Sequence, residues 1–197
     1  MPSEKPAKAP IPAQVVDTVL KQWGDSGRQS TFNVSGKSME PFLVAGDELL
    51  IRHGWHNIHT GGLIAYRQGD SLVVHRLLRI FSLRGERVML LQGDNNSVSD
   101  PLIPVDKLVG SVTAITRGGR TFQIDTPLWI WASFIIAFFA RFPLTFEQWI
   151  GGMRRRWLPG RRSESTAKIR HLMVKAFALP VHFLTCLLWK YSNYASL

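Results

Sequence analysis

A serine, a histidine and two aspartates occur along this chain in an order that could support nucleophilic catalysis. Ser38 lies in the stretch Ser-Gly-Lys-Ser-Met-Glu-Pro, His75 follows in Val-Val-His-Arg, and Asp94 and Asp100 come next. A serine hydroxyl is a poor nucleophile by itself. It becomes reactive when an imidazole can take its proton and a carboxylate holds that imidazole in one tautomer. These residue types therefore indicate covalent catalysis by a serine.

The elements that must position these residues are predicted to be mainly β. Residues 13–25 predict a helix, because Val15, Val16, Val19, Leu20 and Trp23 share one helical face. Short runs with β-type composition follow, separated by glycine-rich turns. We expect strands at residues 31–35, 48–52, 63–67, 71–80, 87–92, 108–117 and 121–124. With no helix expected between them, these strands predict a folded-over or barrel-like all-β body.

Composition divides the chain into three parts. Residues 1–12 carry charges and prolines without an apolar run, so we expect a disordered leader and no secretory signal. Residues 13–126 form the predicted β domain with its N-terminal helix. Residues 127–197 form a predicted helical tail that is apolar and basic. Cys186 is the only cysteine, which excludes an intrachain disulfide and a cysteine-rich zinc site.

The tail suggests a membrane surface as a partner. Residues 141–197 hold ten Lys/Arg and two Asp/Glu, so they carry +8 of the formal net charge of +10. Two apolar stretches, 128–140 and 172–189, flank a run of arginines with tryptophans nearby, a composition typical of segments at a lipid interface. Neither stretch is a clean transmembrane span. The competing interpretation is a pair of helices that pack on the β body or on a second copy.

The ordered motifs resemble the type I signal peptidase clan. Ser-Gly-Lys-Ser38-Met-Glu-Pro, Gly46-Asp47, Val74-His75-Arg76 and Gly93-Asp94-Asn95-Asn96 with Asp100 beyond occur in the order typical of that clan. The histidine makes the chain similar to the serine–histidine branch and to small stand-alone bacterial members of the signal-peptidase and LexA-like group. The resemblance implies a signal-peptidase/LexA-like β-fold over residues 31 to about 117 and a serine endopeptidase that cleaves a peptide segment.

The same resemblance implies roles for individual residues. Ser38 would attack the scissile carbonyl, and His75 would act as general base. Asp100 is the favoured partner of the histidine, with Asp94 as a second carboxylate that supports the site or the turn. Arg76 either pairs with an acid near the site or is solvated.

Residues around the serine are expected to support it. Backbone amides at Ser38 and its neighbours would form the oxyanion hole. Gly36 occupies the position where many signal peptidases have a serine, while Ser35 lies one residue further back and the Lys37 side chain is expected in solvent. Met39 and Pro41, together with Phe42, would close the turn and line the substrate groove.

No cofactor or metal is expected. The acidic run from Asp94 to Asp100 lacks the full ligand set of a calcium loop. His53, His56 and His59 recur every three residues, but they have no Cys or acid at ligand spacing, so we interpret them as exposed loop imidazoles.

Two other functions fit parts of the sequence. One is a LexA-like regulator that cleaves itself and binds DNA. It is disfavoured because only about thirty residues precede the β body, too few for a helix-turn-helix module, and because histidine stands where lysine is expected. The other is a catalytically silent adaptor. The favoured interpretation has a peptide or precursor-protein substrate, lipid contact through the tail and no nucleic acid partner. It places the protein at the cytoplasmic membrane and leaves open the side on which the catalytic body lies.

Overall fold

The computed structural model describes residues 13–69, 71–96 and 98–138. The predicted leader at residues 1–12 and the tail beyond residue 138 lie outside these described residues. Twelve residues of the predicted tail, 127–138, are described and are helical. Within the described residues, no helix is both long enough and apolar enough to cross a bilayer.

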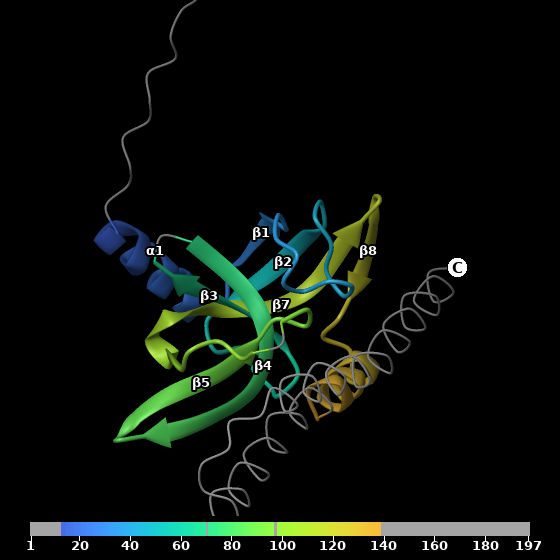
Figure 1. Cartoon of the computed structure of the whole chain (residues 1–197). Helices are drawn as coiled ribbons and strands as arrows, with labels where there is room; N and C mark the ends of the chain where they lie inside the picture. Colours follow the sequence, from blue (N-terminus) through green and yellow to red (C-terminus); the bar gives the residue numbers. More distant parts are fainter. Residues whose placement is uncertain (1–12, 70, 97, 139–197) are drawn as a thin grey trace, which may run out of the picture.

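A helix and eight strands account for most of the described chain (Figure 1). The helix α1 spans Ala13–Asp25, as the apolar periodicity predicted. In chain order the other elements are β1 (Gln29–Asn33), β2 (Glu48–His53), β3 (Leu63–Gln68), β4 (Ser71–Leu83), β5 (Glu86–Gln92), β6 (Ile103–Pro104), the short 3-10 helix η1 (Val105–Lys107), β7 (Leu108–Arg117) and β8 (Arg120–Gln123).

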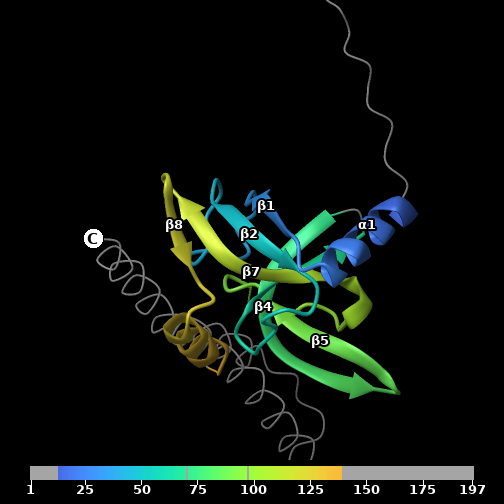
Figure 2. The same cartoon turned by 180° about the vertical axis from the view of Figure 1, so that it is seen from behind.

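All eight strands belong to one antiparallel sheet, which confirms the mainly β prediction. The strand order is β1-β2-β7-β3-β4-β5-β6, with β8 paired to β7. The strands cross one another at steep angles, so the sheet wraps around itself (Figures 1 and 2). Two hairpins turn through two residues each, Arg84-Gly85 and Gly118-Gly119, and all four of these residues have positive φ. Such turns match the right-handed twist of the strands they join.

The sheet has a hydrophobic core on each face, and β4 contributes to both. Alternate side chains of a strand point to opposite faces. Val74 and the neighbouring Leu63 and Ala65 of β3 therefore lie in the first core, while Leu77 lies in the second core with Ile64 and Tyr66. Consecutive residues of β4 thus project into two different environments.

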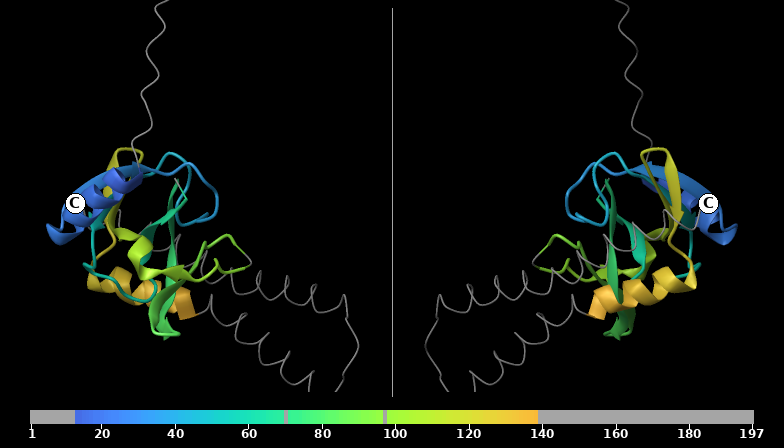
Figure 3. Two further views of the ribbon diagram at one scale, coloured as in Figure 1. Left: turned by 90° about the vertical axis from the view of Figure 1, so that its left-hand side faces the viewer. Right: turned by 90° about the vertical axis from the view of Figure 1, so that its right-hand side faces the viewer.

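The helix at residues 127–138, orange in Figure 3, contributes Trp129 and Ala132 to the first core. Trp129 meets the ring of Phe42 edge to face at 5.8 Å, and both Trp129 and Ala132 are buried. Gly61 allows this close approach, because a Cβ atom there would lie 2.3 Å from the backbone oxygen of Ser133.

Candidate active site

Ser38 lies at the start of a tight turn between β1 and β2. Backbone hydrogen bonds from Glu40 to Lys37 and from Leu43 to Met39 shape this turn. The side chains of Met39, Phe42 and Leu43 are buried in the first core and anchor it. The turn therefore holds a partly exposed serine on a backbone fixed by the sheet.

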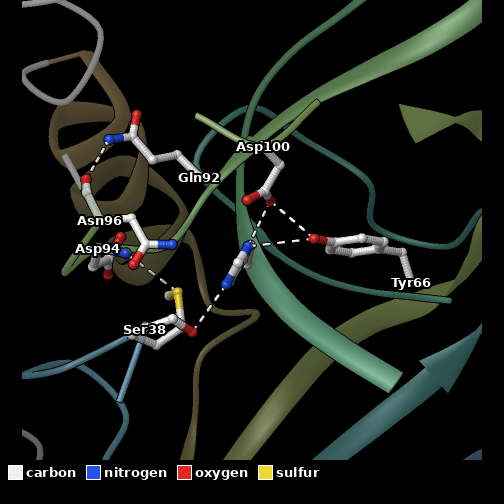
Figure 4. A network of polar contacts seen from close by, with 8 residues as sticks. Ser38, Tyr66, Gln92, Asp94, Asn96 and Asp100 are labelled. Atoms are coloured by element: carbon white, nitrogen blue, oxygen red, sulfur yellow. Dashed lines mark hydrogen bonds and ion pairs between the residues drawn. The ribbon is translucent and has the colours of Figure 1, made fainter. Parts of the chain in front are cut away.

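His75 projects from β4 and contacts both Ser38 and Asp100. Its Nε2 atom lies 2.9 Å from Ser38 Oγ, and its Nδ1 atom lies 2.5 Å from Asp100 Oδ2 (Figure 4). His75 is 6% exposed. Because a carboxylate accepts the Nδ1–H bond, Nε2 of the neutral ring is left unprotonated and can accept the serine proton.

Asp100, not Asp94, contacts the imidazole. Asp100 lies in the connection between β5 and β6, where its backbone N–H donates to Leu91 of β5 at 2.9 Å. Its Oδ2 atom also accepts a hydrogen bond of 2.9 Å from the hydroxyl of Tyr66. The carboxylate is thus held by two side-chain donors.

Asp94 forms a buried ion pair with Arg76. The guanidinium donates to both carboxylate oxygens, at 2.7 and 2.6 Å, and to the backbone oxygen of Gly61 at 2.7 Å. Its Cζ atom lies 5.0 Å from the centre of the Phe42 ring. Arg76 is fully buried, so the interpretation of a solvated arginine is wrong.

The segment that follows β5 is tied to the serine turn. The backbone N–H of Asn95 donates to Ser38 O at 2.8 Å, and its side-chain amide donates to Lys37 O at 3.1 Å. The backbone N–H of Asp94 points at the sulfur of Met39 at 3.4 Å. The close approach of residue 93 to the serine turn requires a glycine, because a Cβ atom there would lie 2.5 Å from Ser38 O. These contacts couple the position of the serine to the acidic segment.

The residues expected to support the serine fall into two groups. Ser35, Gly36 and Lys37 are exposed beside it, as expected for the Lys37 side chain. Met39 is only 3% exposed and packs in the first core, and its thioether contacts the Asp94 backbone. Its place in a substrate groove stays a prediction. Pro41 is half-buried in the same turn, and Phe42, the third residue predicted to line the groove, is buried.

His53 is buried, which corrects its interpretation as an exposed loop imidazole. It is the last residue of β2, and its Nε2 atom is hydrogen-bonded to Ser30 Oγ at 2.8 Å. Trp23 of α1 packs against its ring in an edge-to-face arrangement. Burial lowers the pKa of this imidazole. His56 is exposed and His59 is partly exposed. Among the described residues, no group of three His, Cys, Asp or Glu side chains could hold a metal ion.

Sequence reasoning missed Tyr66 and Arg117. Arg117 forks onto Asp47, donating to its two carboxylate oxygens at 2.7 and 2.5 Å, and also donates to Phe42 O. Asp47 itself accepts from the backbone of Val44, as expected for a turn aspartate. Tyr66 could have been found from register, since it stands opposite Val73, two residues from His75.

An open pocket of about 750 Å³ lies away from these residues. It opens between α1, the segment after β2 and η1. Its lining includes Asp25, Trp55, Asp106 and Lys107, and it includes none of Ser38, His75 or Asp100. The pocket is therefore separate from the hydrogen-bonded line that joins the serine, the histidine and the aspartate.

Comparison with known proteins identifies peptidases. The family model described as Peptidase S24-like matches residues 6–113, more than half of the chain. A protein named signal peptidase complex catalytic subunit SEC11 from Metarhizium robertsii is 32% identical over 98 residues. That match covers 45% of this chain and 56% of the relative. A protein of the same name from Metarhizium acridum matches with the same identity and coverage. The chain thus spans little more than half the length of these relatives.

The buried ion pair predicts a large effect of a single substitution. Arg76→Met leaves the Asp94 carboxylate buried without its partner, and we expect it to lower the free energy of unfolding by about 3–5 kcal/mol. Arg79→Met, the same change at an exposed site of β4, is expected to cost under about 1 kcal/mol. Urea unfolding monitored by tryptophan fluorescence measures both values. Equal losses in the two variants would contradict the structural role given to this pair.

Proposed function

Because the chain belongs to the Peptidase S24-like family, we propose that it is a serine endopeptidase with Ser38 as nucleophile and His75 as general base. Asp100 orients the imidazole. The observation that supports this proposal is the unbroken hydrogen-bonded line from Ser38 Oγ through both nitrogens of His75 to Asp100 Oδ2. Such a line lets one side chain activate the serine and then protonate the leaving group.

The reaction proceeds in two acyl-transfer steps. Ser38 Oγ attacks the scissile carbonyl carbon while His75 Nε2 takes the hydroxyl proton. The tetrahedral intermediate collapses, the C–N bond breaks, and the same proton passes from Nε2 to the leaving amine. Water then gives a proton to Nε2 and attacks the carbonyl carbon of the acyl-serine ester. The ester C–O bond breaks, Nε2 returns that proton to Ser38 Oγ, and the new carboxylic acid leaves and ionises in solution. Backbone N–H groups at Ser38 and its neighbours stabilise the oxyanion.

A segment of a precursor protein is the proposed substrate. The SEC11 relatives carry the name of a signal peptidase subunit, and we extend a substrate of that class to this chain. Among the described residues, the part of β4 before Arg76 pairs with β3 alone, because β5 pairs with β4 only from Arg76 onward. An extended peptide adding to this edge would run toward His75 and Ser38.

The LexA-like alternative requires that the chain cleave itself, and the only Ala-Gly bond in the sequence, Ala45–Gly46, is held in a way that disfavours this. Gly46 N–H donates to Val34 O at 2.9 Å, and Asp47 N–H donates to Val44 O at 3.1 Å. Arg117 further fixes this turn through Asp47. A peptide bond held in such a hydrogen-bonded turn is a poor substrate for strand addition. The silent-adaptor alternative differs from the peptidase in one respect, the reactivity of Ser38.

A lipid surface is the proposed partner of the tail end of the molecule. The helix at residues 127–138 buries Trp129, Ala132 and Ile136 on one side. The opposite side is exposed and apolar, with Leu128, Trp131, Phe134 and Phe138 between 53% and 64% exposed. An apolar helical face that is followed in the sequence by a basic segment fits the interface of an anionic bilayer.

Labelling with a fluorophosphonate tests the nucleophile without knowledge of the substrate. We expect the full chain to be labelled and Ser38→Ala to be unlabelled, because only an activated serine forms the phosphonate ester. Ser82→Ala, at an exposed position of β4, serves as the matched control and should keep the full labelling rate. Equal labelling of Ser38→Ala and the unchanged chain would remove Ser38 from the proposed role, and an unlabelled unchanged chain would favour the adaptor.

The labelling rate should depend on pH as a histidine base requires. Because a protonated imidazole cannot accept the serine proton, we expect the labelling rate to fall as the solution is made acidic. The measurement is the second-order labelling constant at a series of decreasing pH values, with circular dichroism checking that the chain remains folded. A flat profile in the folded chain would speak against His75 as the base.

Co-sedimentation with vesicles containing phosphatidylglycerol tests the lipid contact. Replacing both Trp131 and Phe134 with serine should weaken binding by about tenfold or more, because two large apolar side chains no longer enter the interface. Trp55→Ser, at another exposed tryptophan, is the control and should bind like the unchanged chain. Undiminished binding of the double variant would exclude this helix from the contact.

A further inference from the structure

Tyr66 lies beside the proposed catalytic histidine on the neighbouring strand. In the β3–β4 register, Tyr66 stands opposite Val73 and Ile64 stands opposite His75. Diagonal neighbours of this kind lie on the same face of a sheet, and the two rings have centroids 6.1 Å apart. Tyr66 is fully buried in the second core. Its ring is therefore fixed by packing.

The hydroxyl of Tyr66 donates to the carboxylate that orients His75. It lies 2.9 Å from Asp100 Oδ2, the same oxygen that lies 2.5 Å from His75 Nδ1. The distance from the hydroxyl to Nδ1 itself is longer, 3.4 Å. Burial, followed by the hydrogen bond to Asp100 and the negative charge of Asp100, raises the pKa of Tyr66 well above its usual range. The phenol therefore stays protonated and remains a donor.

Asp100 needs such a partner because of where it lies in the fold. The paired strands β4 and β3 fix His75 and Tyr66. Asp100, by contrast, lies in an irregular segment between β5 and β6. A carboxylate on such a segment can rotate about its terminal torsion, which is broad for aspartate. Two donors that converge on one oxygen, from two adjacent strands, restrict that rotation (Figure 4).

We propose that Tyr66 is a positioning residue, which holds Asp100 Oδ2 in line with His75 Nδ1 and so keeps the imidazole in the tautomer that accepts from Ser38. This inference rests on the proposed function for its chemical meaning. The tyrosine does not touch the substrate. It acts through the carboxylate, by geometry and by a second hydrogen bond to Asp100 Oδ2. The Arg76 side chain, which pairs with Asp94, projects to the opposite face of β4 from His75. This ion pair therefore does not take the place of the Tyr66 hydrogen bond to Asp100.

Proton NMR of the His75 Nδ1–H group, which resonates at low field, tests this positioning role without requiring catalysis. The spectra are recorded on the full chain carrying Ser38→Ala, with and without Tyr66→Phe. Phenylalanine keeps the buried ring and removes only the hydroxyl. We expect the resonance to shift and to broaden through faster exchange with water. Thr113→Val, which removes another buried hydroxyl of the sheet, is the matched control and should leave the resonance unchanged.

Three results would overturn the inference. An unchanged resonance in Tyr66→Phe would show that the hydroxyl does not position Asp100. An equal change in Thr113→Val would show that any loosening of the sheet moves the imidazole. Should Tyr66→Phe fail to fold, 3-fluorotyrosine placed at position 66 retains the hydroxyl and makes it a stronger donor. The His75 resonance should then shift, and an unmoved signal again rejects the role.

Labelling kinetics separate this inference from the proposed function. In the chain that retains Ser38, Tyr66→Phe should react with a fluorophosphonate roughly tenfold more slowly, the loss expected for one hydrogen bond to a charged group. Thr113→Val should react at the unchanged rate. If the unaltered chain is never labelled while the resonance still responds to Tyr66→Phe, the positioning role holds and the peptidase proposal fails. Unchanged labelling of Tyr66→Phe overturns the positioning role alone.

Discussion

The hydrogen bond between His75 Nδ1 and Asp100 Oδ2 is the interaction on which the site depends. It decides which nitrogen of the imidazole carries a proton, and so whether Nε2 can accept from the serine. Three segments meet at the imidazole: a turn, a strand and an irregular connection. The sheet register fixes His75, buried side chains of the first core anchor the Ser38 turn, and Tyr66 with Leu91 holds Asp100.

Strand alternation gives two consecutive residues of β4 two separate tasks. His75 projects toward Tyr66 and Asp100, whereas Arg76 projects into the first core and forks onto Asp94. A buried ion pair adds little net stability over an apolar pair, but its fork geometry fixes the direction of its partner. Asp94 belongs to the same segment as Asn95, which donates hydrogen bonds to the backbone of Ser38 and Lys37. The Arg76–Asp94 pair therefore links β4 to the segment that contacts the serine turn.

Much of this fold follows from local sequence patterns, and the exceptions have physical causes. The helix at 13–25 and seven strands were predictable from periodicity and turn residues, because these act over a few neighbours. The strand β6 has only two residues and exists through its pairing with β5. The burial of His53 depends on Trp23 from α1, and the partners Arg76–Asp94 and Tyr66–Asp100 are separated by 18 and 34 residues. Residue order suggested Ser38, His75 and the two aspartates, and the family resemblance favoured Asp100 as partner of the histidine. The fold brings Asp100 to the imidazole and Asp94 to Arg76.

A crystal structure of the full chain after reaction with a fluorophosphonate tests the central claim most directly. The account predicts phosphorus bonded to Ser38 Oγ, the imidazole of His75 within hydrogen-bond distance of that oxygen or of the phosphonate, and Asp100 on the opposite ring nitrogen. Phosphorus on a different residue, or an imidazole turned away from the ester with Asp100 detached, would contradict it.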